Sequence, residues 1–242
     1  MMTYSSWVIL GSLAGGICIL WPARRTIQNL SDTLTALLIL AVAAVTAGRA
    51  GYVLLNVDYF RDHMNEIVTL ASPGYWGHAA IAGGLVAWWS IGRLRRRIAP
   101  APLIILASLI GIGASVGCIP SGCAYGREVF WTDGWLWHLR ADWPDMYSIN
   151  NPRLPVQAGM AVWLAICAGS ALAVLWAAHR RHLQSSIRGI ALWLTLFAIG
   201  DFSLQFLRAD PMPSFGPLRI AQWADMALFI CGVALSLRYK IG

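Results

Sequence analysis

The side chains most able to do chemistry are charged groups inside long apolar stretches. Arg49, Asp201 and Asp225 each interrupt a run of uncharged residues long enough to cross a bilayer. A charge in such a place costs about 2.5–3.5 kcal/mol to insert, so each is a functional candidate. Two readings are open. The three form a structural ion pair network that fixes helix packing, or they line a polar chamber in which Arg49 meets an anionic headgroup.

Two further groups stand near the ends of apolar stretches. His78 opens one of them among small residues, which would leave its ring room to meet a substrate. The plainer alternative is an ordinary histidine at a helix boundary. Since no second histidine lies at metal-ligand spacing from His78, we expect neither a metal nor a cofactor.

Cys118 and Cys123 lie at the end of another apolar stretch. On a continuous helix their side chains would face different directions, but Pro120 and Gly122 end regular helix here and could bring the two together. A disulfide can then form on an oxidising outer surface. Dithiol redox chemistry is the weaker alternative, because redox pairs more often have two residues between the cysteines.

The composition indicates a membrane protein. Of its 242 residues 58% are hydrophobic and 12% charged, about half the charged share of a soluble domain. A helix needs about 20 apolar residues to span a bilayer. We predict an all-α polytopic membrane protein, one integral-membrane domain over residues 1–242 with seven transmembrane helices. The seven stretches cover roughly 3–22, 33–57, 76–92, 100–120, 154–177, 188–208 and 217–237.

Basic residues set the expected orientation. The loops after the first, third and fifth stretches, together with the C-terminal end, hold 11 basic residues and one acid. Short loops rich in arginine and lysine stay in the cytoplasm, which puts the N-terminus outside and the C-terminus in the cytoplasm. The net charge of +7 therefore reflects membrane topology, and we expect no nucleic-acid partner. Arg49, Asp201 and Asp225 would share a depth of about 10–13 Å below the outer surface.

The predicted outer side holds the longest loop, the 121–153 segment. It combines four tryptophans with charges of both signs. Tryptophan rings concentrate at headgroup level, so the segment either lies along the lipid–water boundary or contributes a simple aromatic belt. We expect any chemistry on this side, because the charged residues of the cytoplasmic loops are almost all basic and only anchor the helices in the membrane.

Six short motifs, taken in order, resemble the prolipoprotein diacylglyceryl transferase family. Their order, spacing and sidedness agree over roughly residues 45–230. The resemblance also implies seven membrane helices with the N-terminus outside. The motifs occupy 48–60, His78 with 83–84, 117–127, 153–157, 206–210 and 222–223.

The resemblance implies a lipid-using transferase in the bacterial cytoplasmic (inner) membrane. Members transfer the diacylglyceryl group of phosphatidylglycerol to the lipobox cysteine thiol of a prolipoprotein and release glycerol 1-phosphate. This chemistry needs an activated thiol, cations that stabilise the phosphoester leaving group, and lateral access for lipid and peptide. The implied partners are phosphatidylglycerol and a prolipoprotein signal peptide.

The resemblance also assigns residues to this chemistry. His78, Arg208 and Gly126 match positions that matter for activity in the family. Planar guanidinium groups suit bidentate contact with phosphate. Contacts to lipid or phosphate would come from Arg49, Arg127, Arg153, Gln157 and Tyr125.

The chain departs from the family pattern at several motif positions. Ser115 stands where the signature has arginine, Cys118 and Cys123 where it has asparagine and glutamate, and Ala79 where it has glycine. Losing a cation from a dry site commonly costs orders of magnitude in rate. The alternative function is therefore a relative that has lost catalysis and serves as a structural subunit of a larger membrane complex.

Overall fold

The computed structural model describes residues 3–23, 27–69, 74–94, 100–180 and 186–238. Several of the basic residues used to predict the orientation lie outside these ranges. They are Arg24, Arg25, Arg95, Arg96, Arg97, Arg181 and Lys240.

Seven long helices in the described residues follow the seven predicted stretches. The sixth ends three residues earlier than predicted, at Gln205, and the seventh begins three later, at Ile220, because the chain between them forms a tight hairpin. The helices are α1 (Tyr4–Ala23), α2 (Ile27–Leu55), α4 (Gly77–Leu94), α5 (Pro100–Ser121), α6 (Val156–Arg180), α7 (Ser186–Gln205) and α8 (Ile220–Arg238).

Five of these helices are long and apolar enough to cross a membrane. The apolar part of α1, Tyr4–Leu20, is shorter than the others. Large apolar side chains such as Leu38 and Val42 on α2 are more than half exposed, as expected where a helix faces lipid. The chain is thus a mostly helical polytopic membrane protein. The five spans are Leu30–Leu55, Ala101–Ser121, Val156–Ala178, Ile187–Gln205 and Ile220–Leu237.

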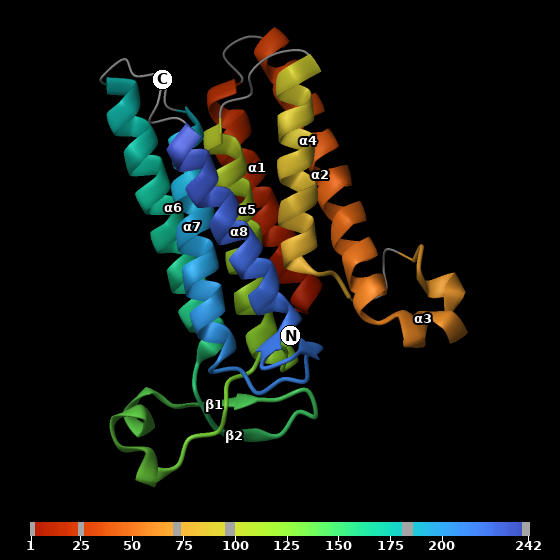
Figure 1. The fold of residues 1–242 in the computed structure, drawn as a ribbon, viewed down its shortest axis with the longest axis vertical. Coiled ribbons are helices and arrows are strands. Elements are labelled where there is room, and N and C mark those ends of the chain that lie inside the picture. Colours follow the sequence, from red (N-terminus) through yellow and green to blue (C-terminus); the bar gives the residue numbers. More distant parts are fainter. Residues whose placement is uncertain (1–2, 24–26, 70–73, 95–99, 181–185, 239–242) are drawn as a thin grey trace. The chain divides into compact units, whose positions relative to one another are not determined.

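The chain forms two compact units, the larger from Met1–Ile19 with Ala99–Gly242 and the smaller from Leu20–Ile98. In the larger unit α5 packs on α6, α6 on α7, and α7 on α8 (Figure 1). Glycine permits the close approach of α1 to α5, since a Cβ at Gly113 would lie 2.4 Å from the carbonyl oxygen of Trp7. Small residues are used in this way at membrane helix interfaces.

In the smaller unit α2 packs on α4. A Cβ added at Gly83 would lie 2.4 Å from the Cβ of Ala47, and one at Gly51 would lie 2.5 Å from the Cβ of Ala79. The small residues that follow His78 therefore let two helices approach each other. Two short helices, α3 (Val57–Asp62) and η1 (Met64–Glu66), follow α2.

The 121–153 segment of the larger unit is more ordered than its sequence predicted. It contains the 3-10 helix η2 (Trp131–Leu139) and an antiparallel hairpin of β1 (Ala141–Pro144) with β2 (Asn150–Arg153), in which Ala141 pairs with Arg153. A second hairpin joins β3 (Ser214–Phe215) to β4 (Leu218–Arg219). Strands of two to four residues are too short for their alternation of apolar and polar residues to be recognised in a sequence.

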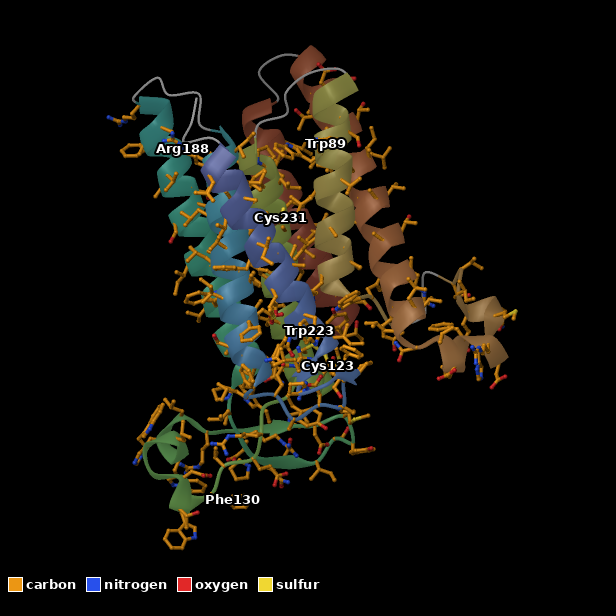
Figure 2. The ribbon with its side chains drawn as sticks, in the orientation of Figure 1. Trp89, Cys123, Phe130, Arg188, Trp223 and Cys231 are labelled. Atoms are coloured by element: carbon orange, nitrogen blue, oxygen red, sulfur yellow. A yellow bond between two sulfur atoms is a disulfide. The ribbon has the colours of Figure 1, made fainter. Side chains whose placement is uncertain are left out.

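Aromatic side chains project from this segment. Trp131 and Trp135 are 78% and 70% exposed, and Phe130 lies at the end of the unit away from the helices (Figure 2). Beneath them a small apolar core of Val129, Leu154 and Val156 ties the segment to the start of α6.

Candidate functional site

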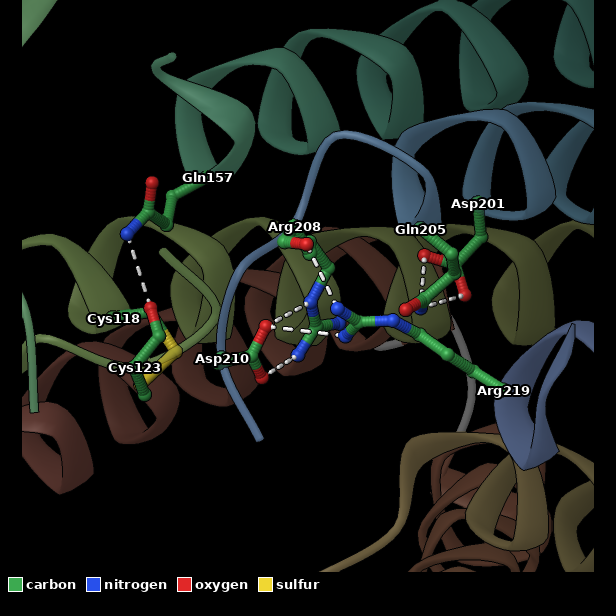
Figure 3. Close-up of polar contacts among 8 residues, drawn as sticks. All are labelled: Cys118, Cys123, Gln157, Asp201, Gln205, Arg208, Asp210 and Arg219. Carbon is green, nitrogen blue, oxygen red and sulfur yellow. Dashed lines mark hydrogen bonds and ion pairs between the residues drawn. A yellow bond between two sulfur atoms is a disulfide. The ribbon is translucent and has the colours of Figure 1, made fainter. Parts of the chain in front are cut away.

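Two arginines share one carboxylate just after α7. Arg208 donates through Nε and Nη2 to the two carboxylate oxygens of Asp210, at 2.8 Å from Nε to Oδ1 (Figure 3). Arg219 reaches the same carboxylate at 3.5 Å and donates to the carbonyl oxygen of Arg208 at 2.7 Å. Two guanidinium groups against one carboxylate leave a net charge of +1. We call these three residues the arginine pair cluster.

Sequence reasoning missed Arg219. The signal that could have found it is the turn at Gly216, which has φ +62° and returns the chain beside the segment that carries Arg208. Glycine adopts this left-handed conformation without steric cost, so the glycine-proline pair at 216–217 predicts a turn there.

A backbone bridge fixes Arg208 against the 117–127 motif. Gly126 pairs with Arg208, the N–H of Arg127 donates to Leu207, and the N–H of Ala209 donates to Tyr125, at 2.8 and 2.9 Å. A Cβ at Gly126 would lie 2.2 Å from the carbonyl oxygen of Leu154. Gly126 is thus the point where three segments meet, which gives a packing reason for glycine at this position.

Cys118 and Cys123 form a disulfide, as the sequence allowed. The N–H of Cys123 donates to the carbonyl oxygen of Cys118 and that of Gly122 to Ile119, at 3.2 and 3.5 Å. With Gly122 at φ +63° this is a Schellman helix end, a motif that brings the side chains of its first and last residues into contact. The helix terminus itself therefore places the two sulfur atoms together.

A pocket of about 130 Å³ opens among α5, α6 and the end of α7. Arg208 and Asp201 bring opposite charges to its wall, and Gln157 brings a neutral polar group. The Ser115 hydroxyl donates to the carbonyl oxygen of Gly111 at 2.9 Å, so this wall has a serine bound to its own helix where the signature of the resembled family has an arginine. The other lining residues are Ala114, Cys118, Ala124, Val156, Met160 and Leu204.

The two intramembrane aspartates come together inside the larger unit. Asp201 on α7 and Asp225 on α8 are buried, and their carboxylate oxygens lie within 4.8 Å of each other. Gln205 donates through Nε2 to both oxygens of Asp201 at 3.2 and 3.3 Å. Arg49 belongs to the smaller unit, so the chamber of all three charges stays a prediction.

Arg153 is buried between two carboxylates. Its Nη2 donates to Glu128 at 2.9 Å and to Asp145 at 3.0 Å, and its guanidinium lies over the Tyr125 ring at 4.8 Å. The Tyr125 pKa is raised, chiefly by burial of the phenol. Arg153 therefore holds the hairpin of β1 and β2 onto the 125–128 strand-like segment, and its charge is neutralised there.

Asp145 organises the turn of that hairpin. Its Oδ1 accepts hydrogen bonds from the backbone N–H groups of Tyr147 and Ile149, at 2.9 and 3.0 Å. The N–H of Ile149 is the largest cause of a lowered Asp145 pKa, with further lowering from Tyr147 and from the charge of Arg153. The turn therefore stabilises the ionised carboxylate of Asp145.

Replacing Arg153 with methionine is expected to destabilise the protein by about 3 kcal/mol, because removing one partner of a buried ion pair leaves its carboxylates uncompensated. The measurement is chemical unfolding in detergent. Arg61→Met is the matched control, since the Arg61–Asp58 pair is 70% and 90% exposed and should cost less than about 1 kcal/mol. Equal losses in the two variants would contradict the structural role of Arg153.

Stability should also depend on the ionisation of Asp145. Its pKa is depressed in the folded protein, so its contribution is full above the unfolded pKa, near 3.8, and disappears as pH falls through the lower folded pKa. We expect the stability advantage of the wild type over Asp145→Asn to be constant from pH 7 to about 5 and to shrink below about pH 4. A thermal-unfolding series against pH measures it, and an advantage that grew on acidification would contradict the assignment.

The Arg49 side chain binds backbone carbonyl groups of residues that follow α3. It is 5% exposed and donates to the carbonyl oxygens of Ile67 at 3.1 Å, of Gly74 at 2.9 Å and of Glu66. Its guanidinium also lies 5.2 Å from the centre of the Phe60 ring. Contacts of this kind hold these three carbonyl groups against α2, a role that the sequence did not suggest.

His78 lies in the first turn of α4, also in the smaller unit. It is buried, and its ring centre lies 5.6 Å from that of Trp76. The N–H of Trp76 donates to the carbonyl oxygen of Gly48 at 2.9 Å, which ties the chain just before His78 to the first motif of the resemblance. Of the predicted site residues in the larger unit, the pocket is lined by Cys118, Gln157, Asp201 and Arg208, whereas the Arg127 side chain is exposed.

Comparison with known proteins agrees with the motifs. A family model described as prolipoprotein diacylglyceryl transferase matches residues 1–238. The chain is similar to phosphatidylglycerol–prolipoprotein diacylglyceryl transferases from Cupriavidus pinatubonensis, at 28% identity with 95% of this chain and 85% of the relative covered, and from Finegoldia magna, at 23% with 99% and 92% covered. The same-named protein of Cupriavidus necator is 28% identical, over 80% of this chain and 70% of that one.

Proposed function

Because this chain belongs to the prolipoprotein diacylglyceryl transferase family, we propose that it transfers the diacylglyceryl group of phosphatidylglycerol to the lipobox cysteine thiol of a prolipoprotein. The observation that supports this most is Arg208 at the wall of a pocket, held by Asp210 and accompanied by Arg219. Two guanidinium groups beside a cavity suit a phosphoester, whose leaving group gains negative charge as its bond breaks.

The proposed reaction forms one carbon–sulfur bond and breaks one carbon–oxygen bond. The peptide thiolate attacks the diacylglyceryl carbon that carries the phosphate oxygen, and glycerol 1-phosphate departs with the bonding electron pair. Arg208 stabilises the charge that develops on the phosphate. We assign removal of the thiol proton to His78, because imidazole accepts protons readily near neutral pH.

The remaining predicted contacts fall into two groups in this proposal. Arg49 and Arg127 supply further cations to the headgroup region, while Arg153, Tyr125 and Gly126 position the wall that carries Arg208. The support for the second group is the backbone bridge between Gly126 and Arg208 and the burial of Arg153 between carboxylates.

We further propose the membrane arrangement in which this reaction takes place. All seven helices span the bacterial cytoplasmic (inner) membrane as one domain over residues 1–242, with the N-terminus outside and the C-terminus in the cytoplasm. The 121–153 segment then lies on the outer side, and its exposed tryptophans, Trp131 and Trp135, rest at the lipid–water boundary. Both substrates of the proposed reaction meet at that surface.

The experiment is a transfer assay with purified protein. Phosphatidylglycerol and a lipobox peptide are incubated with the protein in detergent micelles, and the peptide mass is measured. We expect a gain of one diacylglyceryl group on a peptide with the cysteine and none on the same peptide with serine. No modified peptide under conditions in which a bona fide family member works would refute the proposal.

One observation favours a second candidate function. The hydroxyl of Ser115 is bonded within its own helix at a pocket wall where the family signature has a cation. A relative without catalysis that serves as a structural subunit of a larger membrane complex would tolerate this loss. Purification in mild detergent distinguishes the two: stoichiometric copurifying proteins and no transfer support the subunit, and an active free protein refutes it.

A further inference from the structure

We propose that Gln157 recognises the lipid headgroup: its side-chain oxygen accepts a hydrogen bond from a headgroup hydroxyl inside the pocket beside Arg208. The inference rests on the proposed function for the identity of the lipid. It goes beyond that function in naming the atom that separates hydroxyl-bearing phospholipids from those without a hydroxyl.

The orientation of the Gln157 amide is set by the backbone. Its Nε2 donates to the carbonyl oxygen of Cys123 at 3.0 Å (Figure 3). Turning the amide over would place Oε1 against that carbonyl oxygen, and two acceptors repel each other. The carbonyl is itself held in place, because Cys123 is fixed by the Schellman helix end and by the disulfide to Cys118. The oxygen of Gln157 is therefore the atom left for other contacts.

That oxygen lacks a donor in the part of the chain that the structure describes. Gln157 is 2% exposed, its Oε1 is fully buried and unpaired, and the residue lines the pocket. Buried polar atoms in folded proteins nearly always have a partner. The pocket volume of about 130 Å³ is several times what one water molecule needs, so the missing donor can belong to a ligand.

The polar groups of the pocket wall require two different groups in the same ligand. Arg208 attracts an anion, whereas the oxygen of Gln157 is an acceptor and repels phosphate oxygens. A ligand that satisfies both has a phosphate and, a few atoms away, a hydrogen-bond donor. Arg208 and Asp201 bring one positive and one negative charge to the wall. A neutral hydroxyl therefore suits the amide oxygen better than an ammonium group, which would be drawn to the Asp201 carboxylate and repelled by the guanidinium of Arg208.

The test measures lipid binding without peptide, so it does not depend on turnover. Dissociation constants of phosphatidylglycerol and phosphatidylpropanol, which lacks both headgroup hydroxyls, are obtained by displacing a fluorescent phosphatidylglycerol from the detergent-solubilised protein. We expect the wild type to bind phosphatidylglycerol about tenfold more tightly. In Gln157→Leu the ratio should fall to about one. Gln157→Met, an unbranched substitute, repeats the measurement if the leucine variant does not fold.

Gln222→Leu is the matched control. Gln222 is equally buried, but its amide is bonded at both ends, to the N–H of Arg219 and the carbonyl oxygen of Phe202. Any loss it causes should affect both lipids alike and leave their ratio unchanged. The inference is overturned if the wild type does not distinguish the two lipids, if Gln157→Leu keeps the tenfold ratio, or if phosphatidylethanolamine binds more tightly than phosphatidylglycerol. Absence of transfer with an intact binding ratio would refute the proposed function alone.

Discussion

Arg208→Gln is expected to lower the rate of diacylglyceryl transfer by about 100- to 1000-fold, the usual effect of removing a group that stabilises charge in a transition state. Its guanidinium is the cation at the pocket wall, where Ser115 supplies none. Arg208→Lys should recover only part of the rate, because an ammonium group cannot reproduce the paired contacts to the two oxygens of Asp210. The measurement is the initial rate of peptide modification.

The matched control for Arg208 is Arg140→Gln. Arg140 is exposed and lies 3.8 Å over the ring of Trp137, away from the pocket, so its replacement should change the rate less than about twofold. Unfolding curves of both variants exclude a loss caused by misfolding. A glutamine variant at position 208 that keeps a tenth or more of the wild-type rate would mean that another group stabilises the leaving phosphate.

Gly122→Ala is expected to destabilise the protein by about 3 kcal/mol. The added Cβ would lie 2.0 Å from the carbonyl oxygen of Asp145, and the residue has φ +63°. Collision and backbone strain therefore add, at about 1–3 kcal/mol for the first and about 1–2 kcal/mol for the second. Because this turn also holds the Cys118–Cys123 disulfide and the Gln157 contact, the proposed lipid preference should be lost with it.

Gly216→Ala measures the backbone strain without the collision. Gly216 has nearly the same φ, +62°, but a Cβ there would meet nothing within 4 Å. We expect a loss of about 1 kcal/mol from backbone strain alone. Chemical unfolding of the two variants gives the difference. Equal losses would show that the carbonyl of Asp145 moves away at little cost, and that the close packing of these segments is not required.

The helices could be predicted from the sequence because a bilayer constrains them so strongly. A helix that crosses it needs about 20 apolar residues, and the predicted stretches follow the observed helices to within a few residues, except that α2 begins six residues before the predicted stretch, at Ile27. The disulfide was predictable for a local reason as well. Pro120 and Gly122 mark a helix end, and a helix end of this kind brings residues five apart into contact.

The candidate site was only partly predictable, because its contacts join residues far apart in the chain. Nothing near Arg153 in sequence shows that it pairs with Glu128, 25 residues earlier. Arg219 was missed because it reaches Asp210 through a hairpin of four strand residues. The motif resemblance pointed to both Arg208 and Gln157. Only the structure shows that Arg208 is a cation at the pocket wall and that Gln157 offers a hydrogen-bond acceptor beside it.

Arg49 illustrates a further limit of sequence reasoning. A charge inside an apolar stretch indicated either a chamber or an ion pair, and the structure shows that the guanidinium of Arg49 also donates to the carbonyl oxygens of Glu66, Ile67 and Gly74. Backbone carbonyl oxygens accept hydrogen bonds from an arginine, as carboxylates do, and they leave no trace in residue types. A buried cation in a sequence therefore predicts a polar environment more safely than it predicts a partner.

The central claim, transfer of a diacylglyceryl group from phosphatidylglycerol to a cysteine thiol, is tested most directly by counting both products in one reaction. Glycerol 1-phosphate and thioether-linked peptide are quantified together after incubation of the purified protein with both substrates. The proposed reaction predicts equal amounts of the two, and neither product when the peptide cysteine is replaced by serine. Glycerol 1-phosphate released without modified peptide would identify a lipid hydrolase, and that result would contradict the claim.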